Sequence, residues 1–256
     1  MPQPALEPAL IVPDTHRPFH DKIAWRLFLK VGKALRPKIL VCIGDFADFY
    51  SVSSHSKDPR RALMLESELA DVSVGLDELD ALGADEKHFC AGNHSDRLTR
   101  YLQDKAPALY SVVGIEKVFR LKERGWTYTP YKDTLTLGKM NFTHDVGAAG
   151  RNATFKALDT YQHSIITGHA HRMQYIVEGN AVGEQKLSAQ FGWLGDADAV
   201  DYMHKASVYK NWALGFGVGY FHPKTEVFYA VPVPIIRTPS KHYSCVVNGR
   251  YYEEQG

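Results

Sequence analysis

Short apolar runs alternate with amphipathic stretches over the first two-thirds of the chain. Residues 9–12 form an apolar run that is soon followed by Asp14, and residues 39–43 form a continuous apolar run. An unbroken run of this kind is typical of a strand that is buried on both faces. Between these two runs, apolar residues recur at helical spacing over residues 24–35, and Pro37 ends that helix. The pattern therefore predicts a strand, a helix and a second strand.

The alternation of helix and strand continues further along the chain. Apolar residues recur every three or four positions over residues 65–79, which is the spacing of an amphipathic helix. The apolar run at residues 88–91 predicts a third strand, and a helix is expected over residues 96–102. The first half thus predicts a repeated strand-helix unit.

The second half is richer in strand-forming residues. Apolar residues on either side of Gly138-Lys139 predict a β-hairpin, which is followed by a short helix near residues 155–161 and a strand at residues 165–167. The stretch 212–233 consists mostly of strand formers, with a turn at residues 222–225. A layered sheet core with helices outside accounts for the whole pattern.

No internal repeat, low-complexity tract or long linker divides the sequence. We therefore expect a single domain over residues 1–256, with residues 176–256 as its β-rich C-terminal part. The length and the 45% hydrophobic content are enough for one large core.

Charge and cysteine content narrow the classes of protein. The 30 Lys and Arg residues against 29 Asp and Glu residues leave a net charge of +1, which gives no case for wholesale binding to nucleic acid or anionic membranes. Three cysteines without a C-x-x-C pair favour a reducing compartment. No apolar stretch approaches the roughly 20 residues of a membrane span. A soluble cytoplasmic protein is the expectation.

Five polar clusters appear, and each of them follows a predicted strand. In order, they are Asp14-x-His16, Gly44-Asp45 with Asp48, Gly92-Asn93-His94, His144, and Gly168-His169-Ala170-His171. The carboxyl ends of strands in open α/β sheets face one crevice, where ligands bind. We therefore expect these clusters to meet in space.

Seven of these side chains are candidate metal ligands. They are Asp14, His16, Asp45, Asn93, His144, His169 and His171. Oxygen and nitrogen donors without a thiolate suit Mn²⁺, Fe or Zn²⁺. Seven ligands are too many for one ion, whereas two ions that share a carboxylate, about 3.5–4 Å apart, would use them all.

The motif set resembles the calcineurin-like metallophosphoesterases. Each motif alone is weakly specific, but D-x-H, G-D-x-x-D, G-N-H, a single His and G-H-x-H occur together in this order over roughly residues 9–175. The resemblance implies a layered α/β-β/α sandwich of mixed sheets and a dinuclear phosphoester hydrolase. The strings D-T-H-R-P-F-H-D, G-D-F-A-D-F-Y and G-N-H-S-D-R-L are similar to forms in tailed bacteriophages and bacteria, so the cytoplasm would be the host's if a phage encodes the chain.

The resemblance also implies a role for each residue. Asp14, His16 and His171 would hold one metal; Asn93, His144 and His169 would hold the other; and Asp45 would bridge them. Mn²⁺ is the first expectation, with Fe, Zn²⁺ or Ni²⁺ as alternatives. A metal-bound hydroxide would attack phosphorus while His94 assists the leaving group, and Asp48 would orient His94.

Residues around the motifs carry weaker expectations. Arg97, and after it Arg172, are candidates for contact with the substrate phosphate, although a solvated arginine that pairs with a nearby acid is the commoner case. At least three of the four aromatic residues Trp193, Trp212, Phe216 and Tyr220 are expected to fill a core, although a role in stacking a base is the alternative. Ser95 departs from the acidic residue that many family members carry there; we expect Ser95 or Asp96 to cap the next helix.

The substrate class depends on subgroup features. Phosphoprotein phosphatases of this superfamily carry an Arg where this chain has Phe49, and they lack the G-H-x-H motif. The resemblance therefore favours a phosphodiester substrate, either nucleic acid or nucleotide. Three alternatives stay open: a phosphomonoesterase, a non-catalytic scaffold, and a homo-oligomer in which residues 176–256 dock another copy or shape the substrate groove.

Overall fold

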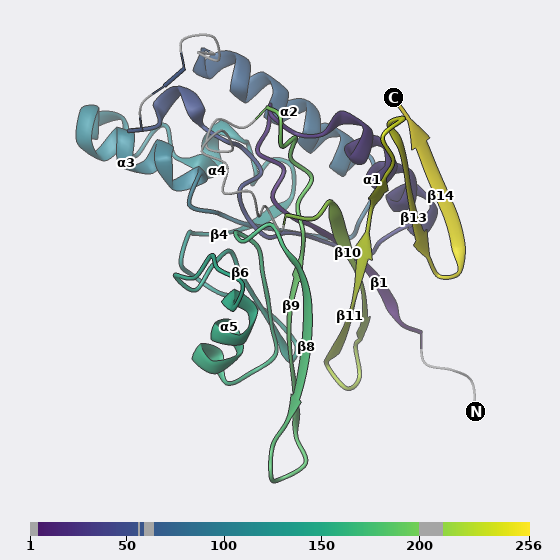
Figure 1. The fold of residues 1–256 in the computed structure, drawn as a ribbon. Helices are drawn as coiled ribbons and strands as arrows, with labels where there is room; N and C mark the ends of the chain where they lie inside the picture. Colours follow the sequence, from purple (N-terminus) through teal and green to yellow (C-terminus); the bar gives the residue numbers. More distant parts are fainter. Residues whose placement is uncertain (1–4, 56, 59–63, 200–211) are drawn as a thin grey trace.

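The computed structural model describes residues 5–55, 57–58, 64–199 and 212–256 (Figure 1). Three β-sheets and five α-helices account for most of these residues.

The first sheet has six strands in the order β11-β10-β1-β2-β3-β4. Its strands are β1 (Glu7–Val12), β2 (Ile39–Cys42), β3 (Glu86–Cys90), β4 (Trp126–Thr129), β10 (Gly215–His222) and β11 (Val227–Pro234). The four early strands run parallel to one another, and β10 and β11 add antiparallel strands beside β1. The β-rich C-terminal part therefore supplies two strands to the first sheet.

The second sheet has five strands in the order β5-β6-β7-β9-β8. They are β5 (Leu135–Leu137), β6 (Met140–Thr143), β7 (Ile165–Thr167), β8 (Met173–Gly179) and β9 (Gln185–Phe191). β6, β7 and β9 run parallel, while β5 and β8 are antiparallel edge strands. Both large sheets are thus mixed.

The helices cover the outer faces of the two large sheets. They are α1 (Lys22–Leu35), α2 (Leu65–Asp80), α3 (Ser95–Lys105), α4 (Ile115–Val118) and α5 (Ala153–Tyr161), with 3-10 turns at Tyr50–Val52 and Pro107–Leu109. Figure 1 shows α1 to α4 above the first sheet and α5 beside the second. The mixed α/β class and the order of helix and sheet layers that the sequence predicted are confirmed.

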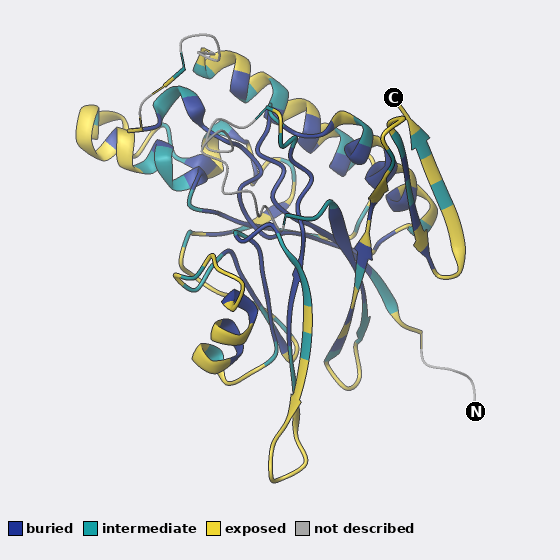
Figure 2. Ribbon diagram, viewed as in Figure 1, coloured by how far each residue is buried: buried dark blue, intermediate teal, exposed yellow. Residues whose placement is uncertain are grey.

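Alternating side chains of β1 explain this layering. Leu10 and Val12 pack toward the helices, whereas Ala9 and Ile11 pack against apolar side chains of the second sheet such as Phe142. Because successive strand residues point to opposite faces, a fully apolar strand is buried on both sides. Figure 2 shows the central strands in dark blue, whereas the outward helix faces, the outer part of β8 and most of β14 are exposed or half-buried.

A third, small sheet packs on α1. It consists of β12 (Ile236–Arg237), β13 (His242–Val247) and β14 (Arg250–Gln255). Lys30 of α1 pairs with Glu254 of β14 at 2.9 Å, and the Tyr243 hydroxyl donates to Asp21 at 2.7 Å. Asp21 also accepts hydrogen bonds from the first N–H groups of α1, so one carboxylate caps the helix and anchors the sheet.

The start of α3 corrects one expectation. The helix begins at Ser95 with His94 as its N-cap residue, so neither Ser95 nor Asp96 caps it. The Asp96 N–H already donates to the carbonyl of Gly92 at 3.1 Å, so the first turn starts inside the G-N-H motif. The side chains of this turn are thereby free to face the polar site.

Candidate metal centre

All seven predicted ligands gather where the parallel strands end. Asp14 follows β1, Asp45 follows β2 and Asn93 follows β3 in the first sheet, while His144 follows β6 and the G-H-x-H motif follows β7 in the second. The two sheets therefore deliver their strand-end loops to one place, as expected for the carboxyl edge of parallel strands.

The first group of ligands consists of Asp14, His16 and His171, which are all buried. The Nε2 atoms of His16 and His171 lie 2.9 Å apart, and His171 Nε2 lies 3.0 Å from Asp14 Oδ2. Asp14 Oδ1 is buried and accepts no hydrogen bond within the described residues. Buried polar atoms are normally paired, so lone pairs that converge on one point fit a cation.

The second group consists of Asp45, His144 and His169, and the Asn93 amide completes it. Asn93 Oδ1 lies 2.9 Å from His144 Nε2 and 2.8 Å from His169 Nδ1. His144 Nε2 lies 3.1 Å from Asp45 Oδ2. Imidazole nitrogens that share one amide oxygen and one carboxylate offer the donor set of a second ion.

The charges within the site are strongly coupled. Burial disfavours a charged imidazole, but Asp45 and Asp14 outweigh burial and raise the pKa of His144 to about 10. Burial acts to raise the pKa of the Asp45 carboxyl, yet His144 and His94 hold that pKa well below its usual range. Such a concentration of buried negative charge is the environment that a divalent cation neutralises.

Hydrogen bonds behind the ligands set their tautomers. His144 Nδ1 donates to the carbonyl of Ile43 at 3.0 Å, and His16 Nδ1 donates to Asp48 Oδ2 at 3.2 Å. In each ring the other nitrogen, Nε2, then presents its lone pair to the ligand group. Orientation of this kind is typical of histidines that bind metals.

Three motif glycines are required by close approach. A Cβ atom at Gly44 would lie 2.1 Å from His144 Nδ1, one at Gly92 would lie 2.1 Å from Asp45 Oδ1, and one at Gly168 would lie 2.6 Å from Asp14 Oδ1. These distances are far shorter than van der Waals contact. The glycines in G-D, G-N-H and G-H-x-H therefore make room for the ligands themselves.

Four of the candidate ligands have left-handed backbone conformations. Their φ angles are 51° at His16, 38° at Asp45, 67° at His169 and 54° at His171. Non-glycine residues in this region cost of order 1–3 kcal/mol each and cluster at functional sites. The fold accepts this strain to aim the four side chains inward.

His94 and Asp48 form a pair at the edge of the site. His94 Nδ1 lies 3.1 Å from Asp48 Oδ2, and His94 Nε2 lies 4.0 Å from Asp45 Oδ2. Burial tends to raise the pKa of Asp48, but His94 and His16 lower it below its ordinary value. Asp48 therefore remains ionised and serves two histidines through one oxygen.

The two predicted arginines differ in position. The Arg97 guanidinium donates to Asp48 Oδ1 at 2.9 Å and to His94 Nε2 at 3.0 Å. Arg172 is half-buried, and its Nε makes no hydrogen bond within the described residues. Arg97 thus belongs to the His94–Asp48 pair.

Ser95 is fully buried, and its Oγ makes no hydrogen bond within the described residues.

His16, Asp48 and His94 form a third group whose donor atoms lie within 4.8 Å of one another. This group shares His16 with the first ligand group. A single cation would therefore occupy one of the two groups and not both. The third group defines an alternative position for a cation, between the two histidines that Asp48 holds.

Two tryptophans line the site in a way that the sequence did not indicate. The Trp193 ring stacks on His171 with centroids 4.7 Å apart, and the Trp212 ring meets His171 edge-on at 4.4 Å. Phe216 is fully buried in the core and Tyr220 packs against it, as expected. An aromatic residue near a predicted sheet has no sequence signal that separates core packing from contact with a ligand.

Arg17, which follows the D-x-H motif directly, lies outside the site. Its buried guanidinium pairs with Asp71 at 2.8 Å and Glu78 at 3.2 Å, and it lies 4.6 Å from the Trp25 ring centroid. These contacts join the motif loop to α1 and α2. Arg17 thus has a structural role.

Comparison with known proteins shows similarity of fold alone. No protein-family model matches the chain, and no curated protein matches its sequence. Vacuolar protein sorting 29 from Cryptosporidium parvum aligns with 97% of this chain and 95% of its own at 11% identity and a TM-score of 0.48.

Two further solved structures align at similar levels. The phosphoesterase Yfce from E. coli aligns with 88% of this chain and 98% of its own at 11% identity and a TM-score of 0.40. The nuclease MPE from Pseudomonas putida aligns with 87% of each chain at 15% identity and a TM-score of 0.36. Function is therefore inferred from the side chains of the site.

The helices within the described ranges are all too short or too polar to span a lipid bilayer.

Proposed function

We propose that this chain is a dinuclear metal-dependent phosphoester hydrolase of the calcineurin-like metallophosphoesterase type. One observation carries the proposal: carboxylates and imidazoles from four separate strand ends converge as two adjacent groups, in which every side chain is buried except that of the half-buried His169. A structural role does not require buried lone pairs to face one another, whereas a pair of cations does.

The residues divide between the two ions according to their contacts. Asp14, His16 and His171 would hold the first ion. Asn93, His144 and His169 would hold the second. Asp45 would bridge the two, because its carboxylate lies 3.1 Å from His144 of the second group and its backbone carbonyl accepts the His16 N–H of the first at 2.9 Å. When bound, two such ions activate water and neutralise the charge of a phosphate during in-line displacement. Mn²⁺ is the proposed ion, with Fe, Zn²⁺ or Ni²⁺ as alternatives.

His94 would donate the proton that the leaving oxygen needs. Its Nε2 faces the edge of the ligand groups, while its Nδ1 is held by Asp48. Asp48 orients the ring through this hydrogen bond. Arg97 now donates to His94 Nε2, so we propose that the substrate phosphate draws the guanidinium away from this nitrogen, which then takes up a proton from solvent and passes it to the leaving oxygen. Arg172 remains the second candidate for contact with the phosphate.

The proposed substrate is a phosphodiester, either nucleic acid or nucleotide. Phe49 stands where phosphoprotein phosphatases of the resembled family carry an arginine, and its ring is fully buried and stacked on Phe119 at 5.7 Å. Residue 49 of this chain therefore supplies no positive charge to the site. The second candidate is a phosphomonoesterase, since the ligand groups alone do not distinguish the two esters.

Hydrolysis of two chromogenic esters tests the proposal. Purified chain with Mn²⁺ is expected to release nitrophenolate from bis(p-nitrophenyl) phosphate faster than from p-nitrophenyl phosphate. Asp45→Asn should abolish release, whereas the matched exposed variant Asp104→Asn should not, because Asp104 only pairs with Lys105 on the surface. Turnover no higher than that of Asp45→Asn would favour a non-catalytic scaffold, and faster cleavage of the monoester would favour the second candidate. A panel of DNA, RNA and cyclic nucleotides with Mn²⁺, Zn²⁺ and Ni²⁺ would then define the substrate and the metal.

A further inference from the structure

A pocket of about 430 Å³ opens beside the candidate metal centre. Its walls come from the loop after β9, the segment before β10, and the turn between β11 and β12. Trp193 and Trp212 form one wall, and their ring centroids lie 4.8 Å apart. The volume falls within the range of about 300–1,000 Å³ that is usual for small-molecule sites.

This pocket shares a wall with the first ligand group. Trp193 and Trp212 both contact the imidazole of His171, one by stacking and one edge-on. His171 Nε2 in turn faces Asp14 at 3.0 Å. The His171 imidazole therefore connects the ligand groups to the pocket wall, and a substituent on a phosphorus atom held at the ligand groups would have to extend past this imidazole to enter the pocket. Trp193 is buried, so Trp212 would supply the ring face that such a substituent meets.

The remaining lining is apolar except at one end. It includes Leu214, Pro234 and Ile236, and its charged residues are Asp21 and Arg237. The Asp21 carboxylate is already engaged by α1 and by the Tyr243 hydroxyl. Arg237 is exposed, and its guanidinium lies 5.9 Å from the Tyr243 ring centroid. The pocket thus combines aromatic and apolar walls with one exposed cation.

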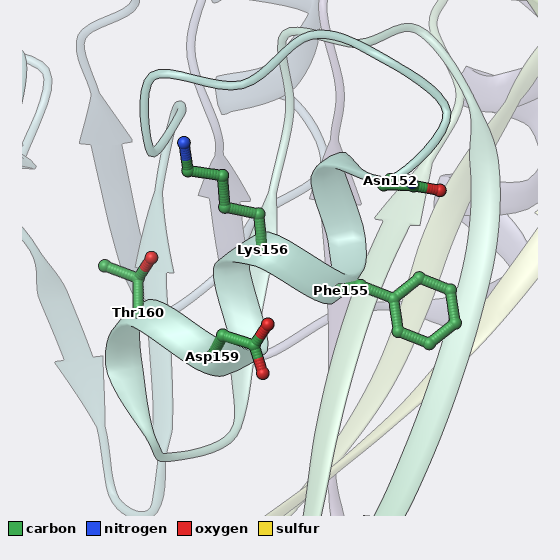
Figure 3. A pocket seen from close by; sticks show the side chains of 5 residues that line it. All are labelled: Asn152, Phe155, Lys156, Asp159 and Thr160. Atoms are coloured by element: carbon green, nitrogen blue, oxygen red, sulfur yellow. The ribbon is translucent and has the colours of Figure 1, made fainter.

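Two other hollows of the described surface lack this combination. Figure 3 shows a groove on α5 lined by Asn152, Phe155, Lys156, Asp159 and Thr160, none of which is a candidate ligand. A second hollow, along the β5–β6 hairpin, is lined mainly by polar side chains such as Gln162 and Lys186. In the pocket beside Trp193 and Trp212, which we call the tryptophan pocket, these two lining rings contact the candidate ligand His171.

We propose that the tryptophan pocket binds the nucleobase of a phosphodiester substrate, with Arg237 placed for the next phosphate. Apolar and aromatic walls suit the flat face of a base, and few hydrogen-bonding groups reach it, so binding would tolerate different bases. The inference rests on the proposed function for the position of the phosphorus, and it narrows the substrate to nucleotide esters.

Two esters with the same leaving group test the inference. Thymidine 5′-(4-nitrophenyl phosphate) carries a base on the retained side, whereas methyl 4-nitrophenyl phosphate carries none. With Mn²⁺, kcat/KM for the thymidine ester is expected to exceed that for the methyl ester by roughly 5- to 150-fold, the range for stacking of one base. Trp212→Leu should bring this ratio close to one, and Ala197→Leu, which narrows the pocket without removing an aromatic ring, should also lower it. Tyr229→Leu removes an exposed aromatic ring of β11 outside the pocket and should keep the wild-type ratio.

Calorimetry provides a readout that does not depend on turnover. The chain with Mn²⁺ is expected to bind thymidine 5′-monophosphate at least tenfold more tightly than inorganic phosphate, and Trp212→Leu should abolish the difference. Equal affinities together with equal kcat/KM values for the two esters would overturn the pocket while leaving the hydrolase intact. If neither ester is cleaved, the proposed function fails, and the calorimetric difference alone then decides whether the pocket binds a base.

Discussion

Substitution of Gly92 by alanine would push a methyl group into the bridging carboxylate. The new Cβ would lie 2.1 Å from Asp45 Oδ1 and 2.4 Å from the Asp45 backbone nitrogen, so a side-chain rotation of Asp45 alone cannot relieve the clash. Overpacking of this kind costs about 1–3 kcal/mol, which lowers Tm by about 2–12 °C for a domain of this size. The shift of Asp45 should also break its bond with the His94 N–H and disorganise both ligand groups.

Thermal unfolding with and without Mn²⁺ separates these two effects. A ligand at 100 times its Kd stabilises a protein by about 2.7 kcal/mol per site, so Mn²⁺ should raise the wild-type Tm by roughly 5–10 °C per ion. Gly92→Ala should lose most of this rise. Gly150→Ala is the matched control, because a Cβ at Gly150 meets no atom within 4 Å. A Gly92→Ala variant with the full Mn²⁺-dependent rise would refute the placement of Asp45 in the metal site.

Three further predictions concern catalysis, pH dependence and the core. His94→Ala should lower kcat on bis(p-nitrophenyl) phosphate by roughly 10²–10⁴-fold while keeping the Mn²⁺-dependent rise in Tm, and the exposed control His55→Ala should change neither. Burial raises the pKa of Glu68 from 4.5 to about 7, so the folded state binds the extra proton, and the stability contributed by this group falls as pH rises through that window. The Tm of Glu68→Gln relative to wild type should therefore increase from pH 4.5 to pH 7; a constant difference would contradict the burial effect. Phe216→Ala removes a fully buried ring that packs edge-on against Phe28 at 5.2 Å and should lower the urea-derived free energy of unfolding by about 3–5 kcal/mol, whereas a loss below 1 kcal/mol would mean that the core can refill the space.

The sequence predicted the strand ends well because two independent signals coincide there. Apolar runs such as residues 39–43 indicate buried strands, and each is followed by polar residues that a core would exclude. The convergence of Asp14, Asn93 and His144 then follows from the geometry of parallel strands. The exact ends of elements were less predictable, since Asp96 bonds back to Gly92 and the first turn of α3 starts early.

Side-chain partners that are distant in the chain could not be predicted. Arg17 follows His16 directly in the chain, yet its guanidinium pairs with Asp71 and Glu78, which lie more than 50 residues away. The bond from Arg97 to His94 depends on helical geometry within α3, where residues three apart share a face. Trp212 was weighed as a core residue because composition alone cannot distinguish a pocket wall from a packed interior.

The central claim is that two ions lie between named ligand groups, and anomalous diffraction from a Mn²⁺-soaked crystal tests it most directly. We predict two anomalous peaks about 3.5–4 Å apart. One peak should contact Asp14, His16 and His171, the other should contact Asn93, His144 and His169, and both should contact Asp45. No peak at these residues, or a single peak enclosed by His16, Asp48 and His94, would contradict the account.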